Sequence, residues 1–194
     1  MSKTYPIFPE LIIEGELSLD TSITKRIRAG VLDAKNSGSA AKTNFGWMTD
    51  KGLPQEEAIK NLQILLGNMF VDEIDKALNG NVKKQVEVNI IEPNVIAVAP
   101  GHVYPVNIDR DRWYNCILWL QTTNKGSMLY QENFGAKLQS TPPLLQPHTN
   151  YIKPKLFRYA FFPAHIPWGL SPNQSAVETI VLNQSFVTKP KVSK

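Results

Sequence analysis

The apolar residues of this chain change their spacing near Val82, and this change narrows the range of possible folds. From Ile23 to Val31 and again from Ala58 to Leu78, apolar side chains recur every three or four positions, which is the spacing of one face of an α-helix. After Val82 the chain instead holds short β-branched or aromatic runs separated by Pro, Gly, Asn or Ser. Short strands that follow a helical N-terminal part are typical of a β-sandwich or jelly roll with helices packed on one sheet.

The N-terminal part predicts one extended segment, two helices and a loop between them. Residues 5–19 hold apolar residues bounded by proline and charge, which favours extended structure. The N-cap residues Asp-Thr-Ser before an apolar stripe predict a helix over about residues 22–35. A proline in the first turn and a terminal Asn-Gly delimit a second helix over residues 54–79. Residues 43–54, TNFGWMTDKGLP, are expected to form a loop.

The length and the later prolines predict how the rest of the chain is organised. A chain of 194 residues suits one domain with a sizeable core. Within a single domain over 1–194, we expect an N-terminal strand and helices over 1–80, a jelly-roll core over 81–188 and a tail over 189–194. The proline-rich stretch 139–154 predicts a long loop that crosses one end of a sheet.

Composition excludes several classes of function. The net charge is +4, but the basic residues are spread along the chain without an aromatic and basic stripe, which argues against nucleic-acid binding. No apolar run approaches the roughly 20 residues that cross a bilayer, and MSKTYPIFPE lacks the apolar core of a signal peptide. The single Cys116 cannot form an intramolecular disulfide, and its place in YNCILWL predicts a buried, inert thiol. We therefore expect a cytoplasmic or virion-borne protein.

Several motifs follow one another in a particular order. TNFGWMTDKGL precedes the second predicted helix, Asn107 and Asp109 follow Gly101, and the strands CILWLQT and NKGSMLYQE lead to FFPAHIPWGL before a last strand. This order resembles the 2-oxoglutarate/Fe(II)-dependent oxygenase superfamily, in particular the small oxygenase-like proteins of cyanophages and other marine bacteriophages. The likeness covers most of residues 43–187. It implies an α+β, β-dominated fold: a double-stranded β-helix (jelly roll) with two N-terminal helices packed on one sheet.

The resemblance also implies where an iron site would lie. Such a site needs two His and one carboxylate that leave positions open for oxygen and co-substrate. In this chain the corresponding positions hold Asn107, Asp109 and Trp168, and the co-substrate Arg would be near Glu178 or Thr179. An indole has no lone pair for iron and a neutral amide oxygen is a weak ligand. The resemblance therefore predicts a lost metal site, with no catalytic residue, no bound metal and no cofactor.

Two histidines offer a fallback ligand set. His165 lies three residues before Trp168, so a register shift in the turn would bring it towards Asp109, where His102 could join them. Strand parity alone directs His102 to the opposite face from Asn107. The simpler interpretation is that His165 is a turn residue hydrogen-bonded to the backbone.

These departures predict a protein without enzymatic activity, in which Trp168 fills the former pocket. The resemblance implies a structural or assembly protein of a phage virion, in the tail, neck or baseplate, that assembles in the host cytoplasm. Its expected partners are other virion proteins in a symmetric assembly of several copies, without nucleic acid or membrane. Two alternatives stay open. One is an active or aberrant Fe(II)/2-oxoglutarate oxygenase, and the other is a module that binds a sugar by stacking it on Trp168 and Tyr104.

Overall fold

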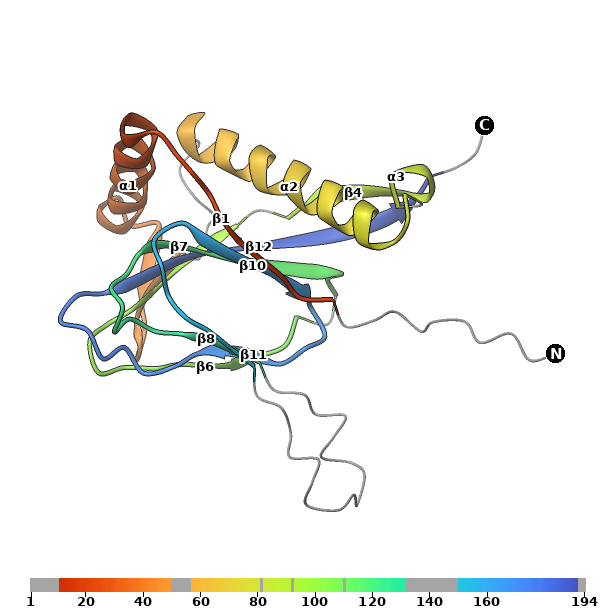
Figure 1. Ribbon diagram of the computed structural model, residues 1–194. Coiled ribbons are helices and arrows are strands. Elements are labelled where there is room, and N and C mark those ends of the chain that lie inside the picture. Colours follow the sequence, from red (N-terminus) through yellow and green to blue (C-terminus); the bar gives the residue numbers. More distant parts are fainter. Residues whose placement is uncertain are drawn as a thin grey trace, which may run out of the picture.

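Two antiparallel sheets face each other in a computed structural model that describes residues 11–49, 57–80, 82–91, 93–109, 111–131 and 150–191. The fold is β-dominated, with the jelly-roll arrangement (Figure 1). The larger sheet has eight strands in the order β1-β10-β7-β12-β5-β3-β2, and β4 also pairs with β12. Its strands are β1 (Ile13–Glu16), β2 (Ala40–Lys42), β3 (Gly46–Thr49), β4 (Val86–Ile90), β5 (Asn94–Val98), β7 (Tyr114–Gln121), β10 (Arg158–Pro163) and β12 (Thr179–Pro190).

The smaller sheet has four strands and forms the opposite wall of the barrel. Its order is β6-β11-β8-β9, and every neighbouring pair is antiparallel. Figure 1 shows it below the larger sheet, with the loops that join the two sheets at either side. The strands are β6 (Tyr104–Asn107), β8 (Leu129–Gln131), β9 (Asn150–Ile152) and β11 (Trp168–Leu170).

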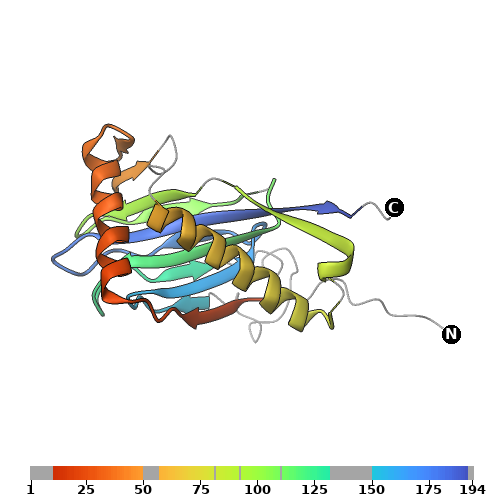
Figure 2. The same ribbon diagram turned by 90° about the horizontal axis from the view of Figure 1, so that it is seen from above.

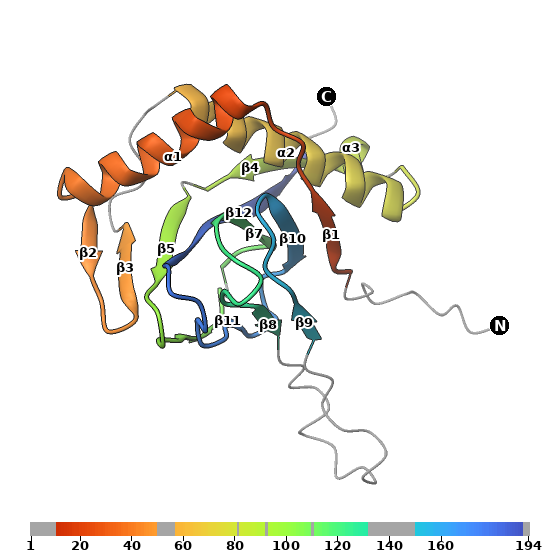
Figure 3. The ribbon, with the colours of Figure 1, turned by 60° about the vertical axis from the view of Figure 1, so that its left-hand side comes forward.

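Three helices are found among the described residues. They are α1 (Thr21–Asn36), α2 (Glu57–Ala77) and the single-turn α3 (Val82–Gln85). Figures 2 and 3 show α1 and α2 lying across the outer face of the larger sheet, on the side away from the smaller sheet. The first two lie close to the predicted ranges 22–35 and 54–79, and the short third helix was not predicted. No helix in the described part of the chain is long and apolar enough to span a membrane.

Strand alternation divides the buried side chains into two cores. On β7, Cys116 and Leu118 face the helices, whereas Ile117 and Trp119 face the smaller sheet. Because both faces of β7 are buried, its sequence YNCILWLQ is largely apolar and does not alternate between apolar and polar residues. Burial also raises the pKa of the Cys116 thiol, so this side chain is an inert part of the core, as the sequence predicted.

The loop predicted over 43–54 is wrong for its first half, because β2 and β3 form a hairpin there. Thr43 and Gly46 close the turn with a backbone hydrogen bond of 3.0 Å, and Trp47 lies in the core. Gly46 has a φ of +147°, and a Cβ at this position would collide with the carbonyl oxygen of Ala97 on β5. Glycine at this position therefore lets β3 approach β5. The hairpin was not predicted because strands of three and four residues are too short to show the alternation of apolar and polar residues that marks a strand.

Candidate functional site

The pairing of β6 with β11 brings the three predicted site positions together. Asn107 and Trp168 are directly opposite each other in this antiparallel pair. Asp109 lies two residues beyond Asn107, and its backbone N–H donates to the carbonyl oxygen of Ala164 in the turn before β11. This bond holds Asp109 against the β10–β11 connection. Asp109 and Trp168, 59 positions apart in the sequence, therefore share one end of the barrel interior.

The Asp109 carboxylate accepts hydrogen bonds from three N–H donors. Trp168 Nε1 donates to Oδ2 over 3.1 Å, and Asn115 Nδ2 donates to the same oxygen over 2.7 Å. Asn107 Nδ2 donates to Oδ1 over 3.2 Å. Bonds to a charged acceptor are stronger than neutral ones, and they fix the orientation of the carboxylate. At the position where the resemblance implies a histidine, the indole of Trp168 therefore donates to Asp109.

The hydrogen bonds continue from Asp109 to the larger sheet. Asn115 on β7 is fully buried, and its Oδ1 accepts from the Ser185 hydroxyl on β12 over 2.8 Å. Asn115 thus connects the two walls of the barrel. The signal for it in the sequence is a single amide within the apolar run YNCILWL, at the parity of Ile117 and Trp119.

Three more amide side chains at this end have buried atoms without a hydrogen-bond partner. Gln131 is 2% exposed, and neither its Nε2 nor its Oε1 has a partner. Asn94 and Asn183, which pair across β5 and β12, each leave Oδ1 unpartnered. By strand parity all three face the barrel interior, like Leu129, Ile96 and Val181 on the same strands. We call the interior side chains at this end the polar layer: Asn94, Asp109, Asn115, Gln131, Asn183 and Ser185.

Aromatic side chains border the polar layer. Tyr104 stacks on Trp168 with ring centroids 5.3 Å apart, and Phe162 meets Trp168 edge-on at 5.9 Å. Burial raises the pKa of Tyr104 to about 12, and the negative charge of Asp109 acts in the same direction. The ring of Tyr104 packs on the indole from within the core, so Trp168 is fully buried. The stacking platform expected for a sugar is therefore covered.

The residues at this site do not fit the iron centre that the oxygenase fold implies. The Trp168 indole carries a hydrogen where a ligand needs a lone pair. Asp109 Oδ2 already accepts two hydrogen bonds and Oδ1 accepts one, so the carboxylate keeps a single acceptor position. No group of three His, Cys, Asp or Glu side chains close enough to hold a metal occurs among the described residues. Asn107, Asp109 and Trp168 therefore do not supply the two histidines and one carboxylate of such a centre.

The fallback ligands do not gather around Asp109. His165 is exposed in the turn between β10 and β11, and no hydrogen bond joins it to Asp109. His102 is exposed as well, and its Nδ1 contacts the carbonyl oxygen of Pro100 at 2.9 Å. The third histidine, His148, lies outside the described residues, as does most of the proline-rich stretch 139–154.

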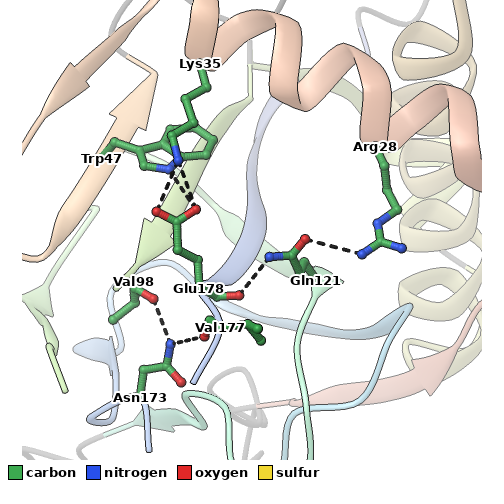
Figure 4. A network of polar contacts seen from close by, with 8 residues as sticks. All are labelled: Arg28, Lys35, Trp47, Val98, Gln121, Asn173, Val177 and Glu178. Carbon is green, nitrogen blue, oxygen red and sulfur yellow. Dashed lines mark hydrogen bonds and ion pairs between the residues drawn. The ribbon is translucent and has the colours of Figure 1, made fainter. Parts of the chain in front are cut away.

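The resemblance implies a co-substrate Arg near Glu178 or Thr179. Thr179 is fully buried, and its hydroxyl oxygen accepts from the backbone N–H of Ser127 over 3.0 Å. The Glu178 side chain points away from the barrel interior. Glu178 pairs with Lys35 of α1 at 3.1 Å and accepts from Trp47 Nε1 of β3 at 3.3 Å (Figure 4). The Lys35 ammonium also lies 5.3 Å from the Trp47 ring centroid. Asn173 fixes the preceding turn through bonds of 2.9 and 2.8 Å to the carbonyl oxygens of Val98 and Val177. Glu178 therefore attaches α1 to the sheet.

Solved structures with the same fold include 2-oxoglutarate/Fe(II) oxygenases. A Pseudomonas putida prolyl-4-hydroxylase matches with a TM-score of 0.63 and 16% identity over 92% of each chain. A Trichoplax adhaerens prolyl hydroxylase, solved with a hypoxia-inducible-factor peptide, gives 0.61 and 16%, over 91% of this chain and 83% of that one. A viral collagen prolyl hydroxylase from Paramecium bursaria Chlorella virus-1 gives 0.55 and 18%, over 94% and 96%. No family model and no curated protein sequence matches the chain.

These likenesses show that the chain has the oxygenase-like fold. They contradict the predicted function of a non-enzymatic assembly protein of a phage virion. The structural neighbours are oxygenases, among them prolyl hydroxylases, and the viral protein among them is itself a hydroxylase. The error has a physical origin: a fold can be read from motif order, but the loss of two iron ligands does not specify a tail, neck or baseplate.

Proposed function

We propose that this chain uses the oxygenase fold to bind a small polar molecule at the polar layer of the barrel. The observation that carries the proposal is Gln131, which is 2% exposed and has no partner for either atom of its amide. A buried polar group without a partner costs about 1–3 kcal/mol. Two such atoms on one side chain, beside the unpartnered Oδ1 atoms of Asn94 and Asn183, are groups that a bound molecule would satisfy.

Asp109 supports the proposal because its carboxylate is held rigidly. Three N–H donors from three strands fix its position, so a ligand would not have to order it on binding. Trp168 and Tyr104 add a tightly packed aromatic border. A few oriented polar groups against an apolar wall are typical of small-molecule sites.

The second candidate function is an oxygenase with a different set of iron ligands. Two features favour it: the oxygenase fold of the structural neighbours, and Asp109 at the position where the resemblance implies the carboxylate ligand. Within the described residues Asp109 lacks histidine partners, so the remaining ligands would have to come from elsewhere in the chain. His148 is the remaining histidine.

A thermal-shift screen of small polar molecules tests the first candidate. Compounds that raise the melting temperature of the wild-type protein are then tested on Gln131→Met, which keeps the side-chain length and removes the amide. The matched control is Gln184→Met, because Gln184 is equally buried but faces the helices on the other side of β12. We expect ligands to lose their effect in Gln131→Met and to keep it in Gln184→Met. Ligands that stabilise both variants equally, or a screen without any ligand, would overturn the proposal.

Anaerobic calorimetry with Fe(II), followed by 2-oxoglutarate, separates the two candidates. The oxygenase candidate requires saturable binding of Fe(II) that is lost in Asp109→Ala. Binding that survives in Asp109→Ala but is lost in His148→Ala would place the metal elsewhere and leave the polar layer to the first candidate. The absence of heat in both steps would exclude the oxygenase candidate.

A further inference from the structure

We infer that α2 is a self-association surface, on which α2 of a second copy of this chain packs antiparallel about a two-fold axis between Leu66 and Gly67. The inference does not depend on what the polar layer binds. It follows from three features of α2. The described elements leave its outer face open, the middle of this face is apolar, and its charges become complementary when the helix is reversed against a copy of itself.

The outer face of α2 is open to a partner. Figure 2 shows α2 on top of the larger sheet, and no other described element crosses over it. The inner face packs into the core through buried residues such as Leu62, Leu66 and Phe70. On the opposite side, exposed side chains recur every three or four positions and form a stripe along the helix. We call these side chains the outer stripe: Glu57, Lys60, Asn61, Ile64, Leu65, Asn68, Asp72 and Lys76.

The middle of the outer stripe is apolar. Ile64 is 55% exposed and Leu65 is 38% exposed. Ile90 of β4, also 38% exposed, lies against the helix one turn after Ile64, at Gly67. Glycine permits this contact, because a Cβ there would be 2.6 Å from Ile90 Cδ1. Apolar surface that leaves water stabilises a contact by about 25 cal/mol per Å², so a partner would gain most at these three side chains.

The charged side chains complement one another when two copies of α2 run antiparallel. With the stated axis, Glu57 faces Lys76 of the second copy. Lys60 then faces Glu73 of the second copy, and Glu73 lies at the border of the outer stripe, where it is half-buried. A two-fold axis makes every relation occur twice, so both pairs of opposite charge are present on either side of the axis.

The other facing pairs are compatible with close contact. They are Asn61 with Asp72, Ile64 with Met69, and Leu65 with Asn68. In the first pair the Asn61 amide can donate to the Asp72 carboxylate, and the second pair is apolar. None of these pairs sets two like charges against each other. The antiparallel arrangement therefore satisfies the stripe along its whole length.

A parallel arrangement does not fit the same residues. It would set each side chain against its own copy, so that Glu57 met Glu57 and Lys76 met Lys76. The antiparallel arrangement also places the positive end of each helix dipole beside the negative end of the other. The dipole of a single helix accounts for Glu57 in the first turn and Lys76 in the last. It does not account for Lys60 near the positive end, or for the exposed Ile64.

Ion pairs inside one chain do not prevent the contact. Glu57 lies 3.8 Å from Arg26, and Lys76 lies 2.9 Å from Glu73. Surface pairs of this kind contribute about 0–1 kcal/mol, so their side chains can turn to a partner at little cost. Two helices about 30 Å long make a smaller contact than the roughly 800 Å² per partner of a standard interface. We therefore expect a weak dimer, with a Kd on the order of 100 μM.

The test changes one charge at a time. In Glu57→Lys, position 57 would meet Lys76 of the second copy, and in Lys76→Glu, position 76 would meet Glu57. We expect each variant alone to dimerise at least tenfold more weakly than the wild-type protein. An equal mixture of the two variants should form a heterodimer, because both facing pairs then have opposite charges. Sedimentation velocity of the full chain, from about 5 to 500 μM, measures each variant, the mixture and the wild-type protein.

The matched controls carry the same charge changes away from α2. Glu14→Lys on β1 and Lys42→Glu on β2 are at exposed positions on opposite edges of the larger sheet. Each should dimerise like the wild-type protein, and mixing them should not strengthen association. Ile64→Asn should weaken dimerisation at least tenfold with little change in melting temperature, because substitutions at exposed positions change stability by about 0.5 kcal/mol or less.

Three outcomes would overturn the inference. A wild-type protein that stays monomeric up to the highest concentration has no such surface. A mixture of Glu57→Lys and Lys76→Glu that stays monomeric, although the wild-type protein dimerises, places the contact elsewhere. A control mixture that associates as strongly as the α2 mixture shows attraction through net charge alone. None of these results bears on the proposed function, since no residue of α2 belongs to the polar layer.

Discussion

The indole N–H of Trp168 donates a hydrogen bond of 3.1 Å to the carboxylate of Asp109, across the paired ends of β6 and β11. These are two of the three positions at which the oxygenase resemblance implies iron ligands. The carboxylate accepts hydrogen bonds from three uncharged N–H donors. In the oxygenases that the chain resembles, a metal would be expected at this end of the barrel. In this chain the same end holds a network of hydrogen bonds, which connects both sheets through Asn115.

The hydrogen bond of Trp168 should contribute measurably to stability. Trp168→Phe keeps most of the buried ring and removes the donor to a charged acceptor, so we expect a loss of about 1.5–3 kcal/mol in the free energy of unfolding. The matched control is Trp119→Phe, because Trp119 is equally buried and donates to a neutral acceptor, the carbonyl oxygen of Ser127, over 3.1 Å. Urea unfolding measures both. A smaller loss in Trp168→Phe than in Trp119→Phe would contradict the importance of the Asp109 bond.

The geometry of the site predicts that an iron-type centre can be rebuilt. In the double variant Asn107→His, Trp168→His, two imidazoles would lie beside the Asp109 carboxylate, because both replaced side chains already contact it. We expect stoichiometric Co(II) binding with visible absorption bands that the wild-type protein and each single variant lack. Loss of the Trp168 packing costs up to about 3–5 kcal/mol, so the melting temperature is measured in parallel. A folded double variant that binds no Co(II) would show that the three positions do not converge as described.

Much of the fold, but only part of the candidate site, could be predicted from the sequence. Helix periodicity and caps placed α1 and α2 to within a few residues at the ends that are described. The order of motifs also located Asn107, Asp109 and Trp168, which the structure places in contact. These signals are either local in the sequence or given by the order of its elements, so a single sequence contains them.

The rest of the site depends on how the strands pair and the helices pack. Residues that are close together in the sequence do not determine this. Gln131 is the last residue of the three-residue strand β8. The direction of its side chain depends on the pairing of Gln131 with Trp168 on β11. Glu178 lies at the predicted place for an Arg, but its direction towards Lys35 is decided by how α1 packs. The predicted function of a structural virion protein was wrong for a different reason: it was inferred from missing ligands, and absent chemistry does not specify a function.

Two buried tyrosines should make stability fall at high pH. Burial raises the pKa of Tyr104 and of Tyr114 to about 12, from about 10 in the unfolded chain. Between these values the unfolded state loses the proton and the folded state keeps it, so the free energy of unfolding decreases as pH rises from 10 to 12. Each tyrosine accounts for up to about 3 kcal/mol. Urea unfolding between pH 9 and 11.5 measures the fall, to which the buried Cys116 thiol also contributes, and Tyr104→Phe should make the slope shallower. An unchanged slope in Tyr104→Phe would contradict the burial of the Tyr104 hydroxyl as a cause of the fall.

The pair between Lys35 and Glu178 should hold α1 without serving the barrel interior. Glu178→Arg restores the residue type that the resemblance implies but places it beside the Lys35 ammonium, 3.1 Å from the present carboxylate. We expect like-charge repulsion to cost about 1 kcal/mol, in the range of surface ion pairs, and to speed hydrogen exchange at the backbone amides of α1. Adding Lys35→Glu should reverse both effects, because the pair is then re-formed with its charges exchanged. The Arg should not create binding of 2-oxoglutarate, since position 178 faces α1 and β3 (Figure 4). Calorimetry that detected 2-oxoglutarate binding in Glu178→Arg would show that this side chain can reach the interior.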